Sequence, residues 1–252
     1  MTMTTLALGA ALYFDYELAS DPLPLITLWS RIATQAELSS WMLTAKGATK
    51  PVDFDATQLV TRIGSGVTTT VGIESRNRDV TIIAGTARAA SLDRRPPAPR
   101  WSYDLAVALG DERVAALGRD AIVTALCDFA GAVAATAGVV MWSASLDFAR
   151  ALALLSSRPD LPREHVSALV EAQVNRSHWG NVIRGPEWGT FLSAPLVAKL
   201  EGRALPAART IPLTSGGAFV QVTAEPFDVA APPRILAELR EALAPVMGSS
   251  GG

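Results

Sequence analysis

Cysteine and histidine are nearly absent from this 252-residue chain. The single cysteine, Cys127, lies in an apolar stretch, where a free cysteine behaves as a small hydrophobic side chain. One cysteine cannot form a disulfide framework within the chain. The two histidines, His165 and His178, are too few for a histidine-rich metal site, and neither zinc-finger nor H-E-x-x-H spacing occurs. We therefore expect neither a disulfide nor a bound metal.

Charge is also scarce and nearly balanced. Charged residues make up 18% of the chain, whereas an average globular protein has about 25%. There are 22 basic and 24 acidic residues, which give a net charge of −2. Phosphate binding needs a basic excess or a basic face, so we do not expect nucleic acid as the main partner. Only three of the basic residues are lysines, and alanine is abundant, as is typical of a GC-rich bacterial genome.

One segment is long and apolar enough to be tested as a membrane span. Residues 121–142 carry a single charge, Asp128, and about 20 apolar residues suffice to cross a bilayer. However, alanine adds little to insertion, and Gly138 followed by two valines is typical of a helix that ends before a buried strand. The start of the chain lacks the positively charged region of a secretory signal. We therefore expect a cytoplasmic protein that does not interact with membranes.

The apolar pattern predicts strands and helices in no strict alternation. It favours an α+β fold, with an antiparallel sheet or sheets and helices packed on one face. Residues 91–100 contain three prolines and three arginines, which interrupt the pattern and predict a connection. We expect two structurally similar α+β halves that share a core, at residues 1–90 and 101–247. Residues 248–252 are predicted to form a disordered tail.

Familiar catalytic motifs are missing. The nucleophile elbow, the dinucleotide-binding glycine motif and the P-loop do not occur, and we predict no cofactor. Asp15 and Glu17 lie two positions apart on a strand predicted over residues 6–18, so they share a face as a pair of acid/base carboxylates would. A solvated strand face has the same pattern. An enzyme with a carboxylate or histidine site, using Asp15, Glu17 or His178, therefore stays open as an alternative.

The most distinctive stretch spans residues 178–193. It contains two Trp-Gly pairs nine residues apart, with an arginine, a Gly-Pro turn and a glutamate between them. Tryptophan and arginine often anchor protein interfaces, because they bury a large area and still donate a hydrogen bond. The stretch thus predicts a partner-binding surface formed by His178, Trp179, Arg184, Glu187 and Trp188. In the alternative interpretation, both tryptophans fill the core and the glycines serve tight turns.

This stretch resembles the bacterial immunity proteins of polymorphic toxin systems. The nearest groups are the immunity protein 52 type and related uncharacterised families, whose pattern is W-x-N-x-x-x-G-P-x-W-x-x-x-L-S followed by a later strand. The matching residues are Trp179, Asn181, Gly185, Pro186, Trp188, Leu192 and Ser193, and then Val220, Gln221, Val222 and Thr223. The resemblance covers about the last third of the chain.

The resemblance implies a non-catalytic cytoplasmic protein that binds and neutralises a cognate toxin. Inhibitors of nucleases often carry strong negative charge, so the net charge of −2 does not favour a nuclease as that toxin. A structural assembly module is a further alternative. Self-association into a homo-oligomer also stays open.

Overall fold

The computed structural model describes most of the chain in separate ranges. These ranges are residues 6–16, 18, 20–34, 37–44, 47–48, 50–64, 68–86, 103–147, 149, 186–228 and 233–247. The predicted connection at 91–100 and the predicted tail at 248–252 lie outside them. The division into halves at 1–90 and 101–247 therefore stays a prediction.

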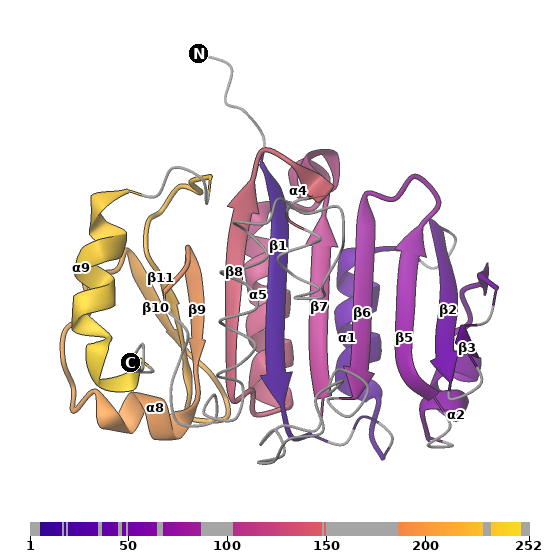
Figure 1. The fold of residues 1–252 in the computed structure, drawn as a ribbon, viewed down its shortest axis with the longest axis horizontal. Coiled ribbons are helices and arrows are strands. Elements are labelled where there is room, and N and C mark those ends of the chain that lie inside the picture. The colour runs from indigo at the N-terminus through magenta and orange to yellow at the C-terminus, as the bar shows by residue number, and fades with distance from the viewer. Residues whose placement is uncertain are drawn as a thin grey trace.

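A single sheet of eleven strands organises the described residues (Figure 1). Its order is β10-β11-β9-β8-β1-β7-β6-β5-β2-β3, and β4 also pairs with β2. Every named strand pair in this sheet is antiparallel. The strands are β1 (Ala7–Phe14), β2 (Leu38–Thr44), β3 (Gly47–Ala48), β4 (Val52–Asp53), β5 (Thr68–Ser75), β6 (Val80–Thr86), β7 (Tyr103–Leu109), β8 (Ala137–Ser143), β9 (Gly189–Leu192), β10 (Arg209–Pro212) and β11 (Ala218–Gln221).

The helices follow the strands at irregular intervals, so the predicted α+β class is confirmed. They are α1 (Leu23–Ile32), α2 (Ala56–Gly64), α4 (Asp111–Leu117), α5 (Arg119–Ala132), α8 (Ala194–Lys199) and α9 (Arg234–Ala242), followed by the 3-10 turn η3 (Ala244–Val246). Residues 121–142 form most of α5 and then most of β8, so the predicted order of helix and strand is confirmed. The predicted boundary is wrong, because α5 already ends at Ala132 and Gly138 lies inside β8, where it pairs with Leu12 of β1. Within the ranges that the structure describes, no helix is long and apolar enough to cross a membrane.

Strand β1 lies in the middle of the sheet, between β7 and β8. All eight of its residues are buried, because both of its faces are covered. Leu8 and Leu12 point to one face and join the main core, whereas Gly9 and Ala11 point to the other. A Cβ atom on Gly9 would lie 2.6 Å from the carbonyl oxygen of Ala149, so only glycine lets that segment cross the strand so closely.

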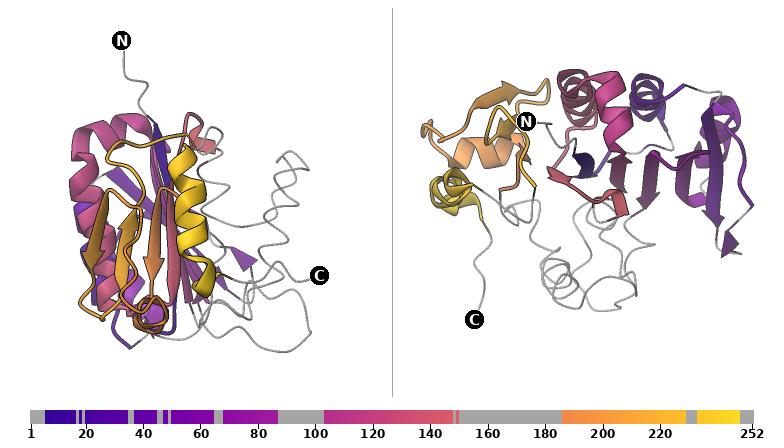
Figure 2. Two further views of the ribbon diagram at one scale, coloured as in Figure 1. Left: turned by 90° about the vertical axis from the view of Figure 1, so that its left-hand side faces the viewer. Right: turned by 90° about the horizontal axis from the view of Figure 1, so that it is seen from above.

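The main core lies between the sheet and the helices α1, α4 and α5. Helices α1 and α5 lie side by side behind the sheet in Figure 1, and the view from above in Figure 2 agrees. Arg31 of α1 forms an ion pair with Asp128 of α5. The apolar faces of both helices and of the central strands form one continuous cluster, which includes residues from β1 to β11. This cluster holds the two ends of the sheet together.

The prediction that helices pack on one face does not extend to α8 and α9. Strand residues alternate between faces, and in β9 and β11 both sets are apolar. Phe191 and Phe219 join the main core, whereas their neighbours Leu192 and Val220 join a second cluster with α8, α9 and η3. Because both faces of these two strands need cover, α8 and α9 pack on the face opposite to α5.

Both ends of the described sheet finish in short strands. β10 is four residues long and ends in Pro212, which has no N–H to offer to another strand. At the other end, β2 is bordered by β3 and β4, which have two residues each. Short strands and an edge proline are ordinary protection against pairing with another chain.

Candidate functional site

Only part of the predicted partner-binding surface lies within the described residues. Glu187 and Trp188 are described, and His178, Trp179 and Arg184 lie outside the described ranges. The structure therefore does not test whether the five residues come together.

Trp188 lies in the core. Its side chain is 0% exposed. Its ring meets that of Trp142 edge-on, with centroids 5.2 Å apart, and lies 6.4 Å from that of Phe219. Its Nε1 donates a hydrogen bond to the backbone carbonyl of Glu225, at 3.1 Å. For this tryptophan, the position agrees with the alternative interpretation, in which the indole fills the core.

Glu187 precedes this buried position and is half-buried. Its backbone N–H donates to Thr190 Oγ1 at 3.1 Å, which fixes the chain where it enters β9. Trp188 is fully buried, whereas part of the Glu187 residue is exposed to solvent. Glu187 is thus the described residue of the predicted surface that a partner can reach.

A turn over residues 222–225 follows β11, at the end of the sheet where β9 begins. Gln221 Nε2 donates to the carbonyls of Thr223 and Ala224, at 2.9 and 3.4 Å. Thr223 Oγ1 donates to the same Glu225 carbonyl that Trp188 holds, at 2.5 Å. These bonds hold the turn from within, so its conformation does not depend on a ligand.

An ion pair joins this turn to the start of α5. Arg119 donates two hydrogen bonds to the carboxylate of Glu225, at 2.7 and 3.3 Å. These bonds and the charge of Arg119 lower the pKa of Glu225. The same contact raises the pKa of Arg119, although partial burial opposes the change. The two side chains are 30% and 67% exposed, so the pair presents both charges to solvent in a fixed geometry.

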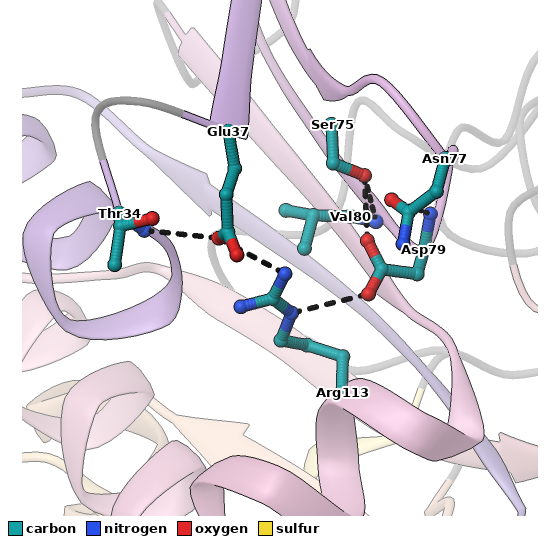
Figure 3. A network of polar contacts seen from close by, with 7 residues as sticks. All are labelled: Thr34, Glu37, Ser75, Asn77, Asp79, Val80 and Arg113. Atoms are coloured by element: carbon teal, nitrogen blue, oxygen red, sulfur yellow. Dashed lines mark hydrogen bonds and ion pairs between the residues drawn. The ribbon is translucent and has the colours of Figure 1, made fainter.

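A second polar network lies at the other side of the same end of the sheet (Figure 3). Arg113, on α4, donates through NH2 to Glu37 Oε2 at 3.0 Å and through Nε to Asp79 Oδ2 at 3.2 Å. The arginine is 14% exposed and Asp79 is 17% exposed. Ser75 Oγ donates to Asp79 Oδ1 at 2.6 Å and accepts from the N–H of Val80 at 3.0 Å.

This network shifts the pKa values of its two carboxylates in the same direction. Burial alone would raise the pKa of Asp79, but the hydrogen bonds from Ser75 and Arg113 and the charge of Arg113 together lower it. The hydrogen bond from Thr34 lowers the pKa of Glu37, and the charge of Arg113 adds to this against a small effect of burial. Both groups are thus held as carboxylates. The network links the end of α1, the start of β2, the β5–β6 turn and α4, which is a structural role.

The carboxylate pair considered for catalysis differs from its prediction. β1 ends at Phe14, so Asp15 lies beyond the strand. The chain turns there, because Tyr16 bonds through its hydroxyl to Asp21 and through its carbonyl to the N–H of Leu18. Asp15 is exposed, and Glu17 lies outside the described residues. The argument that a shared strand face pairs the two carboxylates is therefore wrong.

Cys127 lies in a setting that does not favour a reactive thiol. Cys127 is buried in α5, and burial raises the pKa of its thiol to about 12. The thiolate is the reactive form of cysteine, and it is absent at neutral pH. In the part of the chain that the structure covers, no three histidine, cysteine, aspartate or glutamate side chains are grouped so that they could hold a metal ion.

Comparison with known proteins finds similarity among solved structures alone. No known protein family matches the chain, and no curated protein is significantly similar to it. Among solved structures, it is similar to the Pseudomonas aeruginosa T6SS protein PA0821, with a TM-score of 0.68 and 15% sequence identity. The match covers 96% of this chain and 76% of that chain. At this level of identity, the likeness shows the fold.

Proposed function

We propose that this protein is a non-catalytic, immunity-type protein that binds and neutralises a cognate bacterial toxin. The observation that carries the proposal is the similarity of nearly the whole fold to a T6SS protein, with 96% of this chain covered. The resemblance of residues 179–193 to immunity proteins of toxin systems points independently to the same setting. The protein would act in the cytoplasm, on a toxin that enters or is made there.

The mechanism we propose is occlusion. A stable protein–protein interface buries about 800 Å² on each partner, and a few anchoring side chains supply most of its affinity. A surface that is already ordered loses less entropy on binding. The turn after β11 meets this requirement, because Gln221, Thr223 and Trp188 hold its carbonyls without a ligand.

Within this mechanism, the residues of the 178–188 stretch take two roles. We propose that His178, Trp179, Arg184 and Glu187 contact the toxin. Trp188 would support that surface from the core, because its side chain is fully buried and bonded to the turn at Glu225. In this proposal, Trp188 stabilises the toxin-binding surface but does not itself contact the toxin.

The test uses the product of the gene adjacent to the one that encodes this protein. The two proteins are co-expressed, the complex is isolated by size-exclusion chromatography, and the Kd is measured by calorimetry. We expect a stoichiometric complex and protection of a bacterial host from growth arrest by the neighbouring product. Absence of both would refute the proposal, as would turnover of a small substrate by the isolated protein.

Point variants then locate the surface. Arg184→Ala and Glu187→Ala should each weaken binding about tenfold or more, the effect of losing about 1.4 kcal/mol of binding free energy. The matched control is Arg240→Ala, on the exposed side of α9, which should leave the Kd unchanged. If the two test variants change the Kd no more than the Arg240→Ala control does, the toxin binds elsewhere on the protein.

A further inference from the structure

A row of three paired residues crosses β2, β5 and β6 on one face of the sheet. Trp41 of β2 pairs with Gly72 of β5, and Gly72 pairs with Ile83 of β6, so the three share a face. Val71 and Ile73, on either side of Gly72, join the main core. The row therefore lies on the face opposite α1, which is the front of the sheet in Figure 1. Trp41 and Ile83 are both partly exposed there.

The indole of Trp41 lies flat on the backbone of Gly72. A Cβ atom on Gly72 would lie 2.0, 2.2 and 2.4 Å from Cε2, Cζ2 and Nε1 of the ring. Because these three distances are so similar, the Cα–Cβ bond would point at the face of the ring and not at its edge. Glycine thus lets the ring rest on the sheet, and the other face of the ring is turned away from the sheet.

A carboxylate side chain shares this face with the ring. Glu74 follows Gly72 by two positions, and the register places it diagonally from Trp41. Such diagonal neighbours are about 7–8 Å apart, a gap that aromatic and long side chains span. The basic residue nearest in sequence, Arg76, pairs with Asp53 at 3.5 Å. Within the ranges that the structure describes, Glu74 takes part in no ion pair.

From this arrangement we infer that Trp41 and Glu74 bind an arginine side chain of a protein partner. A guanidinium group is planar and cationic, so it stacks on the free face of an indole while its N–H groups donate to a carboxylate. The inference rests on the proposed function in taking that partner to be the toxin. It adds a contact far along the sheet from Glu187, because four strands separate β9 from β5.

The first test uses the isolated protein and N-acetylarginine amide as the probe. The six tryptophans give six indole N–H signals in an NMR spectrum, and Trp41→Phe assigns one of them. We expect the Trp41 signal to shift and saturate with the probe at low salt, and to stay in place with uncharged N-acetylcitrulline amide. Glu74→Gln should weaken the response several-fold, whereas Glu241→Gln, on the exposed side of α9, should not. An unshifted Trp41 signal, or an equal response to the citrulline derivative, overturns the inference.

The second test measures the same contact in the complex with the product of the neighbouring gene. Glu74→Gln and Trp41→Ala should each raise the Kd about tenfold, and Glu241→Gln should leave it unchanged. A complex whose Kd is unchanged in both test variants overturns this inference and leaves the proposed function standing. If no complex forms, the proposed function fails, and the titration with the arginine derivative decides this inference alone.

Discussion

Replacing Trp188 tests whether its side chain lies in the core or at the surface. The side chain is 0% exposed, packs against Trp142 and donates a hydrogen bond from Nε1. Truncation of a buried tryptophan to alanine costs about 3–5 kcal/mol, because transfer free energy is lost and a cavity is left. Trp188→Ala should therefore lower the free energy of unfolding by that amount. For a chain of this size, each 1 kcal/mol lowers the Tm by about 2–4 °C.

Trp188→Phe removes the hydrogen bond but keeps much of the packing. Phenylalanine keeps an aromatic ring in the site but cannot donate to the Glu225 carbonyl. That carbonyl keeps the hydroxyl of Thr223 as a donor, so the loss of the hydrogen bond itself should cost about 1 kcal/mol. The smaller ring also leaves a cavity. The total loss in the free energy of unfolding should therefore lie between about 1 kcal/mol and the loss of the alanine variant.

Urea denaturation followed by circular dichroism measures both variants. Leu23→Ala is the control, because Leu23 is a large apolar side chain that is 63% exposed. Its effect should stay within about 0.5 kcal/mol, as for other surface substitutions. The reasoning is refuted if Trp188→Ala unfolds at the same urea concentration as the unchanged protein. Such a result would mean that the indole lies at the surface in solution.

Three further predictions follow from the structure. Gly9→Val should destabilise the protein by about 1–3 kcal/mol, because its Cβ would lie 2.6 Å from a carbonyl oxygen, and a thermal melt would show it. Arg113→Ala should destabilise the protein at pH 7, and because the folded state lowers the pKa values of Asp79 and Glu37, this effect should shrink as the pH falls below about 4; an unchanged difference at pH 3 would contradict it. Cys127 should resist iodoacetamide at pH 8 in the folded protein and react once urea unfolds it, as mass spectrometry would detect.

The local structure of this protein is well predicted by its sequence. The apolar run at residues 121–142 predicts a helix followed by a buried strand, and α5 and β8 occur in that order, although Gly138 lies inside β8 and not at the end of the helix. The antiparallel α+β class also follows from strands and helices without strict alternation. These features depend on neighbours in the sequence, so a pattern of a few residues contains them.

Features that depend on distant residues are not predictable in this way. Arg113 meets carboxylates 34 and 76 positions away, and Arg119 meets one 106 positions away. No local pattern marks these arginines among the others. The position of Trp188 has the same origin, because its cover comes from β8 and β11. The sequence predicts it as part of a partner-binding surface and leaves the core as an alternative, which is the position that the structure shows. The face chosen by α8 and α9 likewise depends on the pairing of β9 with β11.

The central place of β1 has a consequence for synthesis on the ribosome. Its two partners are Tyr103–Leu109 and Ala137–Ser143, so Leu8 pairs with Leu109 on one side and Trp142 on the other. At bacterial elongation rates, the nascent segment waits on the order of 10 s before its second neighbour exists. During that time an all-apolar strand is exposed, which is the kind of segment that chaperones bind. Slow codons between β7 and β8 would lengthen this wait. They would therefore lower the yield of folded protein and leave the activity of the molecules that do fold unchanged.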